Sequence, residues 1–357
     1  MLIREIFPPS PKKETIRVLL LLSGGLDSVL AGCILQDQGL EIVGLTFESP
    51  FFGAERAVSE ARRMNWPLVV VDITEEEIQI VEKPKYGYGR HMNPCLDCHL
   101  QMVRLAGQLL PRYQAAFVAT GEVLGERPLS QNRQALQIVE RESRLEGYVL
   151  RPLSAQLLPE TEVEKKGWVK REALLDIQGR SRKRQMELAE KYQLEGYATP
   201  SGGCLLTDPG YSARLRKLRS WRGRLKKEDI WLLRYGRHFF GSDYWVVIGR
   251  DEGENRILRQ LALPEDIKMT TVSKKGPQTV VRFKKKETPV KIREAALLTI
   301  RYSQARREEK AIVKWSSRAK EEKLELAKAE WSKYLTENYN LRSTSIAYRE
   351  LTEDYNP

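Results

Sequence analysis

The feature that most constrains the fold is an apolar run, residues 17–22, which ends in the glycine-rich turn Ser23-Gly24-Gly25. Helical spacing follows from Ser28 to Gln38, and Gly39 stands where a helix would end. A continuous apolar run is typical of a strand that is covered on both faces, as in a parallel sheet. The sequence therefore predicts a buried strand that leads through a tight turn into a helix.

The alternation of strand and helix continues along the first half of the chain. Further strands are predicted at residues 41–47, 67–72, 116–120 and 148–153, and helices at residues 55–64 and 100–110. This order is the signature of an open α/β sheet with helices on its faces.

Excess positive charge is confined to the C-terminal part. Of the net charge of +12, residues 1–204 contribute 26 Lys and Arg against 27 Asp and Glu, whereas residues 205–357 contribute 34 against 21. This asymmetry favours a surface for a polyanion, although solvated basic helices would have the same composition. No stretch approaches the roughly 20 apolar residues of a membrane span, and residues 1–13 lack the apolar segment of a signal peptide. We expect a cytoplasmic protein without membrane contacts.

The C-terminal part has its own pattern. Short strands are predicted at residues 244–249 and 279–283 between basic turns, and a charged helix at residues 305–334. These indicate a smaller, basic α+β domain. We therefore expect an N-terminal extension at residues 1–14, an α/β domain at 15–210, a basic domain at 211–318, and a charged helix and tail at 319–357.

The turn at residues 23–28 has the composition of a phosphate-binding loop. Its two glycines let the backbone approach a ligand closely, and the first N–H groups of the following helix attract an anion. Asp27 would repel a phosphate unless a divalent cation lay between them, so Mg²⁺ is implied. The turn is not a Walker loop, because that loop needs Gly-Lys-Ser/Thr. The residues expected to bind the nucleotide here are Ser23, Gly24, Gly25, Asp27 and Ser28.

The motif Ser-Gly-Gly-Leu-Asp-Ser resembles the PP-loop of the ATP pyrophosphatase superfamily. The resemblance implies the fold of the adenine-nucleotide alpha-hydrolases, the HUP-like type. It also implies cleavage of ATP between its α and β phosphates, with transfer of AMP to a carbonyl oxygen. In that family pattern Thr46 and Phe47 would lie near the adenine, and Gly121 would belong to a second nucleotide-binding element.

Three cysteines form the second chemical signal. Cys95 and Cys98 are spaced as C-x-x-C at the head of a predicted helix, and Cys204 follows two glycines much later. The three could belong to a zinc site with His99, could be unrelated buried thiols, could hold an iron–sulfur cluster with one open iron, or could carry and resolve a persulfide. Cys33, amid apolar neighbours, is interpreted as core packing.

The combined order of motifs resembles the tRNA thiouridine synthetases. The phosphate loop is followed by Asn93-Pro94-Cys95, by Ala119-Thr120-Gly121-Glu122 and by the late Gly-Gly-Cys that ends at Cys204. Cys95 stands where the 2-thiouridine synthetases have an aspartate, which favours their cluster-dependent, three-cysteine branch. The resemblance covers about residues 15–210, and it also includes the nucleotide-binding half of the 4-thiouridine synthetases.

The resemblance implies ATP-dependent thiolation of a tRNA uridine, with the carbonyl oxygen adenylated and then replaced by sulfur. The sulfur would be held on a [4Fe-4S] cluster and supplied as sulfide or by a donor protein. The implied cluster ligands are Cys95, Cys98 and Cys204. The implied catalytic residues are these three cysteines and Asp27, and Asp97 and His99 are candidates for proton handling. Alternatives are a persulfide enzyme without a cluster, a PP-loop ligase or amidotransferase for a small molecule, and an RNA-binding factor with a regulatory nucleotide site.

Basic residues mark the expected RNA contacts. Residues 211–318 weakly resemble the NFACT-type RNA-binding domain, with aromatic residues interleaved among Arg and Lys. The resemblance to the thiouridine synthetases also implies that the loop at residues 121–133 lies over ATP and the target uridine, with Arg127 and Arg133 on phosphates. A basic run at residues 178–184 opens a helix and adds further cations, and both segments could instead be solvated surface. The expected RNA-binding residues are Arg127, Arg133, Arg180, Arg182, Lys183, Arg184, Arg237 and Arg250.

Overall fold

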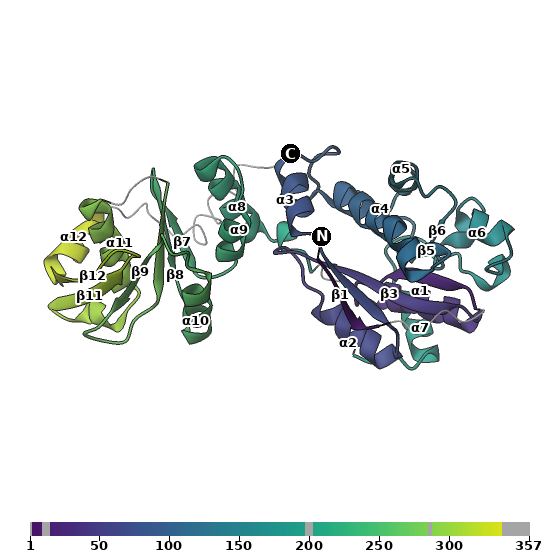
Figure 1. Cartoon of the computed structure of the whole chain (residues 1–357), viewed down its shortest axis with the longest axis horizontal. Coiled ribbons are helices and arrows are strands. Elements are labelled where there is room, and N and C mark those ends of the chain that lie inside the picture. Colours follow the sequence, from purple (N-terminus) through teal and green to yellow (C-terminus); the bar gives the residue numbers. More distant parts are fainter. Residues whose placement is uncertain (1, 9–14, 197–202, 285–287, 338–357) are drawn as a thin grey trace. The chain divides into compact units, whose positions relative to one another are not determined.

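The computed structural model describes the chain except residues 1, 9–14, 197–202, 285–287 and 338–357 (Figure 1). The chain divides into two compact units, Met1–Leu205 and Leu206–Pro357. In the described residues, no helix is both long enough and apolar enough to cross a lipid bilayer.

The N-terminal unit is built on a six-stranded sheet with the order β1-β4-β3-β2-β5-β6. Strands β2 to β6 are parallel, and β1 pairs antiparallel with β4. The strands are β1 (Leu2–Phe7), β2 (Arg17–Leu21), β3 (Glu41–Glu48), β4 (Leu68–Asp72), β5 (Phe117–Thr120) and β6 (Val149–Leu150). The predicted α/β fold is confirmed. Residues 2–7, within the segment expected to be an N-terminal extension, add this edge strand to the sheet.

Helices cover both faces of this sheet (Figure 1). Along β2 the side chains alternate: Val18 and Leu20 join the apolar core beside α1, whereas Leu19 joins the core beside α4. The helices are α1 (Leu26–Asp37), α2 (Glu55–Met64), α3 (Thr74–Glu82), α4 (Cys95–Tyr113), α5 (Arg133–Ser143), α6 (Glu162–Lys165) and α7 (Lys183–Lys191), with short 3₁₀ turns η1 (Ala155–Leu157) and η2 (Arg171–Ala173). Cys33 is 4% exposed in the α1 core, as predicted.

The C-terminal unit contains an antiparallel sheet with the order β12-β11-β9-β10-β8-β7. Its strands are β7 (Arg237–Phe240), β8 (Tyr244–Ile248), β9 (Ile267–Thr271), β10 (Thr279–Phe283), β11 (Lys310–Ser316) and β12 (Glu321–Ala327). Its helices are α8 (Pro209–Arg222), α9 (Lys227–Leu233), α10 (Glu252–Leu261), α11 (Pro289–Arg301) and α12 (Lys328–Glu337), with the 3₁₀ turn η4 (Gln304–Arg307). A further 3₁₀ turn, η3 (Leu205–Thr207), spans the division between the units.

The predicted helix over residues 305–334 is wrong. Residues 310–327 form the β11–β12 hairpin, and among the described residues that follow it the helix is α12. The physical reason is a period of two: Ala311, Val313 and Trp315 are buried, whereas the residues between them are less so. The alternation of buried and exposed positions is hard to recognise in the sequence because this segment contains many charged residues.

One ionic cluster lies inside the C-terminal core. Arg282 of β10 donates to Asp266 through Nε at 2.9 Å and Nη2 at 2.6 Å, and to Asp229 through Nη1 at 2.8 Å. All three side chains are at most 2% exposed. Asp229 also accepts a hydrogen bond from Arg222 Nε at 2.9 Å, so the two carboxylates face two guanidinium groups.

Candidate active site at the carboxyl ends of the parallel strands

The phosphate-type loop joins the carboxyl end of β2 to α1. Gly24 has φ +74°, and a Cβ there would lie 2.5 Å from the Arg56 carbonyl carbon, so the position requires glycine. The Ser23 hydroxyl accepts a hydrogen bond from the Gly25 N–H at 3.2 Å, and the Ser28 hydroxyl donates to the Gly25 carbonyl at 2.8 Å. Gly25 begins the helix without a side-chain cap. The first-turn N–H groups of α1 are therefore available to an anion.

Asp27 lies in the first turn of α1, beside cations from two other segments. Its Oδ2 is 4.0 Å from Arg182 Nη2, an ion pair too long for a hydrogen bond. Burial raises the pKa of Asp27, and the charges of Arg182 and Arg127 counteract that rise. Burial also raises the pKa of Glu126, and the nearby charge of Asp27 adds to the effect. Two carboxylates and two guanidinium groups thus meet beside the loop.

The segment after β5 touches the same loop. A Cβ on Gly121 would lie 2.5 Å from the Ser28 nitrogen, so this glycine allows backbone to pack directly on the start of α1. On β3, which pairs with the other side of β2, Thr46 and Phe47 are both 5% exposed, and Phe47 packs in the core beside α4. Their expected role near adenine stays a prediction.

Glu122 connects this segment to the helix that carries the cysteines. Its Oε1 is 3.0 Å from His99 Nδ1, and its Oε2 accepts hydrogen bonds from Arg151 Nε at 3.0 Å and from the Thr120 hydroxyl at 3.1 Å. Arg151 also pairs with Glu140 of α5. Glu122 and Arg151 are 6% and 2% exposed, so this is a buried network.

Charge in this network reaches the thiol of Cys95. Burial disfavours the Glu122 carboxylate, but Arg151 and His99 outweigh it and lower the pKa of Glu122 to about 2. Burial likewise opposes a charged His99, yet the Cys95 thiolate and Glu122 raise the pKa of His99 to about 10. The same pairing overcomes burial at Cys95 and lowers the pKa of that thiol to about 7. The arrangement is a thiolate–imidazolium pair supported by a carboxylate.

The other two thiols lie close enough to interact. Burial raises the pKa of Cys98 well above its ordinary value, and Glu77, Cys204 and Cys95 add to the rise. Glu77 of α3 is fully buried against Cys98, and burial raises its pKa to about 7. Among the described residues, no three His, Cys, Asp or Glu side chains surround a common point as ligands of a metal ion.

Sequence reasoning missed three of these residues as members of the site. Glu122 belongs to the motif Ala119-Thr120-Gly121-Glu122, and Arg151 lies within the strand predicted at residues 148–153, so both carried a positional signal. Glu77 lies in the acidic run Glu75–Glu77, which gives no hint that its third member is buried. Asp97, a predicted proton-handling residue, instead accepts hydrogen bonds from the backbone N–H groups of Lys85 and Tyr86 at 2.9 and 3.0 Å.

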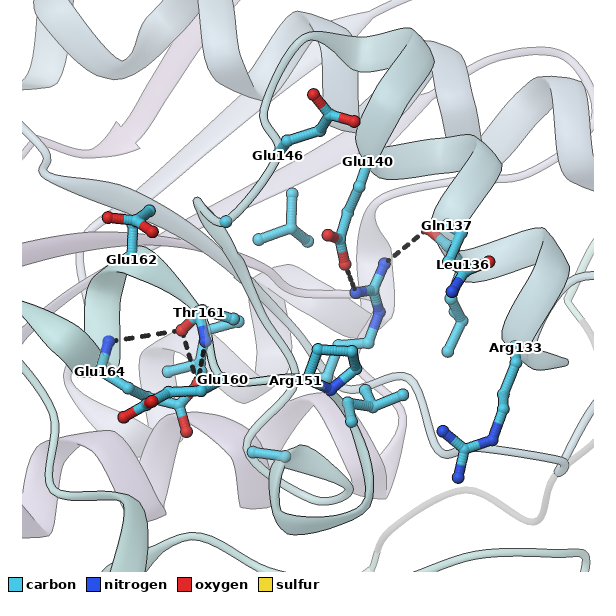
Figure 2. Close-up of a pocket in the computed structure, with 16 residues that line it drawn as sticks. Arg133, Leu136, Gln137, Glu140, Glu146, Arg151, Glu160, Thr161, Glu162 and Glu164 are labelled. Atoms are coloured by element: carbon cyan, nitrogen blue, oxygen red, sulfur yellow. Dashed lines mark hydrogen bonds and ion pairs between the residues drawn. The ribbon is translucent and has the colours of Figure 1, made fainter.

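A cavity of about 350 Å³ lies behind Arg151, between α5 and the segment that follows β6 (Figure 2). Figure 2 shows the Arg151 guanidinium directed at Glu140, while Arg133 points away from this ion pair. Four further glutamates line the cavity: Glu146, Glu160, Glu162 and Glu164. Arg133 therefore lies on an acidic wall, where contact with an RNA phosphate is less favourable than its charge alone suggests.

The side chains of the basic run at residues 180–184 have different partners. Arg182 faces Asp27, as described above, whereas Arg184 pairs with Asp176 at 2.6 Å. Arg180 and Lys183 are exposed and have no ion pair within the described part of the chain. Their predicted contact with RNA is untested.

In the C-terminal unit, a groove of about 760 Å³ lies between the start of α10, the β9–β10 turn and η4. We call it the basic groove, because its wall includes Arg250, Lys274, Lys275, Arg306 and Arg307. Lys275, Arg306 and Arg307 form no ion pair with another described residue. Three acids, Asp251, Glu252 and Glu308, and the ring of Tyr302 complete the wall.

Two predicted RNA-binding residues lie at or beside this groove, and both have protein partners. Arg250 Nε donates to Glu254 Oε1 at 2.9 Å. The Arg237 guanidinium lies 4.7 Å from the centre of the Tyr302 ring, and its Nη1 lies 3.4 Å from the Gly249 carbonyl oxygen. These contacts hold both side chains in place, while the unpaired cations of the groove are free to meet phosphates.

Comparison with known families agrees with both halves of this description. Residues 14–157 match the family described as thiamine biosynthesis protein (ThiI), and residues 236–339 match the NFACT protein RNA binding domain. These matches confirm the resemblances predicted from the sequence.

Individual relatives are similar over part of the chain. A tRNA-specific 2-thiouridylase MnmA from Cytophaga hutchinsonii is 29% identical over 166 residues, which are 41% of this chain and 45% of the relative. A probable tRNA sulfurtransferase from Clostridium acetobutylicum is 30% identical over 137 residues, which are 36% of this chain and 34% of the relative. The chain thus spans less than half the length of these relatives. A crystal structure of a 4-thiouridine synthetase–RNA complex with bound ATP aligns with a TM-score of 0.34 and 21% identity, over 61% of this chain and 52% of that one.

Proposed function

We propose that the chain is an ATP-dependent tRNA sulfurtransferase, because its N-terminal unit matches the ThiI family model and its C-terminal unit matches the NFACT RNA-binding domain. One observation carries the proposal. Within three residues, the segment after β5 touches both chemical elements: Gly121 packs on the phosphate loop, and Glu122 binds His99 beside Cys95. A nucleotide on the loop would therefore lie close to a reactive thiol.

In the proposed reaction, the carbonyl oxygen of a tRNA uridine attacks the α-phosphate of ATP. The α–β phosphoanhydride bond breaks, pyrophosphate leaves, and the base becomes an adenylated imidate. Because AMP is a far better leaving group than oxide, a sulfur nucleophile can then displace it to give thiouridine. The N–H groups at the start of α1 stabilise charge on the phosphates.

Magnesium fits the loop. Asp27 Oδ1 is buried and has no hydrogen-bond partner among the described residues, and Glu126 supplies a second carboxylate nearby. Mg²⁺ prefers one or two carboxylates together with substrate phosphates. When bound, the ion would neutralise charge between Asp27 and the phosphates.

For sulfur, we propose that Cys95, Cys98 and Cys204 hold a [4Fe-4S] cluster. Three thiolates suit such a cluster with one iron left open, and the electrostatic influence of Cys95 and Cys204 on Cys98 supports their proximity. When bound, the cluster would supply an open iron that carries sulfide, delivered as the free ion or by a donor protein. The three side chains are not preformed as ligands, so they would have to reorient to bind it.

That same lack of a preformed ligand set favours a second mechanism, in which Cys98 and Cys204 work without a cluster. The outer sulfur of a persulfide on one thiol attacks the activated carbon and AMP leaves. The second thiol then attacks the inner sulfur, which releases thiouridine and leaves a disulfide between the cysteines. An external thiol must reduce this disulfide before another cycle.

The basic groove is the proposed contact for tRNA. Its unpaired cations suit phosphates. A tRNA substrate would place the protein in the cytoplasm.

The central experiment is mass spectrometry of tRNA nucleosides from cells that lack the gene. We expect one thiolated nucleoside to disappear, and to return with the wild-type gene but not with Cys95→Ala, Cys98→Ala or Cys204→Ala. Unchanged nucleosides would refute the proposal. Activity on a small molecule without RNA would instead indicate a ligase or amidotransferase. If all three cysteine variants kept full function, the protein would be an RNA-binding factor.

Anaerobic purification separates the two sulfur mechanisms. The cluster predicts a brown protein with visible absorption and bound iron. A colourless, iron-free and fully active protein would eliminate the cluster and leave the persulfide route.

A further inference from the structure

The basic run at residues 180–184 divides into two faces where α7 begins. Arg182 and Gln185 are three residues apart, so they share one face of the helix. That face is directed at the phosphate loop, because Arg182 lies 4.0 Å from Asp27 and the Gln185 amide is among the groups that lower the pKa of Asp27. Arg184 instead pairs with the exposed Asp176.

The inward face contains polar atoms that lack partners. Gln185 is fully buried, yet neither its amide oxygen nor its amide nitrogen has a hydrogen-bond partner of ordinary geometry within the described chain. The same holds for Arg182 Nε and Asp27 Oδ1. Buried polar groups without partners are costly and rare in folded proteins. Their meeting at one point, beside a loop of phosphate-binding geometry, indicates a missing polar ligand.

We propose that Arg182, with Arg127 and Gln185, binds the phosphates of the nucleotide held by residues 23–28 and does not bind RNA. This inference rests on the proposed function, because it assumes that the loop binds ATP. It differs from the expectation that Arg182 contacts tRNA, and for Arg127 it specifies the phosphates as those of the nucleotide. A guanidinium group offers several N–H donors in a plane, which matches the oxygens of a phosphate.

The charges around the loop are consistent with this assignment. Asp27 and Glu126 place two carboxylates where a triphosphate would lie, and Arg127 and Arg182 are the cations that act on both. Without nucleotide these four groups balance one another. With Mg²⁺ and ATP bound, the carboxylates can face the metal ion while the guanidinium groups face the phosphates, so each charged group has a partner of opposite sign.

The test compares two ligands and matched arginines. Wild type, Arg182→Ala, Arg127→Ala and the control Arg184→Ala are titrated separately with Mg²⁺–α,β-methylene-ATP and with unmodified tRNA. We expect Arg182→Ala to weaken binding of the ATP analogue at least about tenfold, as for loss of a charge-assisted hydrogen bond, and Arg127→Ala to weaken it less. Both variants should bind tRNA as wild type does. Arg184→Ala should bind the analogue normally.

Other outcomes overturn the inference in distinct ways. If Arg182→Ala binds the ATP analogue as wild type does, the inference is refuted, whether or not tRNA binding is weaker. The proposed function would stand. A wild-type protein that binds no analogue would refute the nucleotide site and the inference together. Since a variant could misfold, Arg182→Gln and Gln185→Leu are measured beside it, with circular dichroism of each. Weaker analogue binding in folded Arg182→Gln and Gln185→Leu supports the assignment.

Discussion

Each unit contains a buried arginine between two carboxylates. The two clusters differ in which residue binds the remaining oxygen of one of these carboxylates. In the C-terminal unit, Arg282 binds Asp229 and Asp266, and the remaining oxygen of Asp229 is used by Arg222. In the N-terminal unit, Arg151 binds Glu122 and Glu140, but the remaining oxygen of Glu122 is used by His99.

The difference separates a structural cluster from a functional one. Buried ion pairs seldom add stability compared with apolar packing, but removal of one partner leaves an uncompensated buried charge. The Arg282 cluster lies in the core of the C-terminal unit, and its ion pairs join Arg282 and Arg222 to Asp229 and Asp266, so its effects should be confined to folding. The Arg151 cluster ends at a histidine beside a thiol, so it should affect both folding and the reactivity of Cys95. The predictions below test this contrast.

The largest expected effect is on stability in the C-terminal unit. Arg282→Met should lower its free energy of unfolding by about 3–5 kcal/mol, because Asp266 is left buried without its cation. Urea denaturation followed by tryptophan fluorescence measures this, since Trp245 lies 5.9 Å from the guanidinium. The exposed pair Arg293–Glu330 offers a control: Arg293→Met should cost no more than about 1 kcal/mol. Equal losses for both variants would remove the contrast between buried and exposed pairs.

In the N-terminal unit, Glu122→Gln should change the reactivity of Cys95 and the rate of thiolation. Loss of the carboxylate removes the charge that supports the His99 imidazolium, so the pKa of Cys95 should rise from about 7. Thiolation should fall roughly 100-fold, the scale for a misplaced acid–base group. Binding of the ATP analogue should stay within about twofold, since Glu122 does not touch the loop.

Iodoacetamide alkylation of Cys95 as a function of pH gives an independent measurement. Wild type should react with a midpoint near pH 7, and Glu122→Gln with a higher midpoint. Identical midpoints with lost activity would mean that Glu122 acts only on structure, as Arg282 does.

The sequence predicted most of the parallel sheet because its strands are continuous apolar runs at regular intervals. It did not predict β1, since Leu2–Phe7 is a partly exposed edge strand with no apolar run. Nor did it predict the β11–β12 hairpin, where β12 has only Leu326 buried within a charged sequence. Edge strands are set by pairing with a neighbour, and that information lies elsewhere in the chain.

For the site, motif spacing identified the loop and the thiols but not the side chains that join them. The contact between Glu122 and His99 is a tertiary contact between the segment after β5 and α4, and no local pattern encodes it. We expected Arg182 to contact RNA because the sequence does not show which way a basic residue at the start of a helix faces. Its position beside Asp27 follows from the packing of α7 against α1, whereas Arg127, whose charge also acts on Asp27, lies in the loop between β5 and α5.

Glu77 provides a further test of how burial acts in the N-terminal unit, because burial favours the neutral form of its carboxyl group. Its pKa of about 7 exceeds the ordinary value of 4.5, so between these pH values the folded state retains a proton that the unfolded state has lost. Stability should therefore fall as pH rises through this window, and the loss is complete above about pH 7. Glu77→Gln should remove this fall and gain up to roughly 3 kcal/mol relative to wild type between pH 5 and pH 8. Urea denaturation at both pH values measures the difference, and an equal fall in both proteins would contradict the assignment.

The smallest expected effect concerns exposed charge in the C-terminal unit, where cations without carboxylate partners should bind phosphate. The triple variant Lys275→Ala, Arg306→Ala, Arg307→Ala should weaken tRNA binding about three- to tenfold at physiological salt, and each lost phosphate contact should lower the slope of log K against log salt by roughly 0.7–0.9. A matched control removes Lys310, Lys314 and Lys320, whose partners are Glu325, Glu321 and Glu322. Both variants change the net charge equally, so a uniform field would weaken binding equally, with the same slope. A larger loss and a shallower slope for the groove variant alone would show that RNA contacts specific unpaired cations, which neither buried cluster supplies.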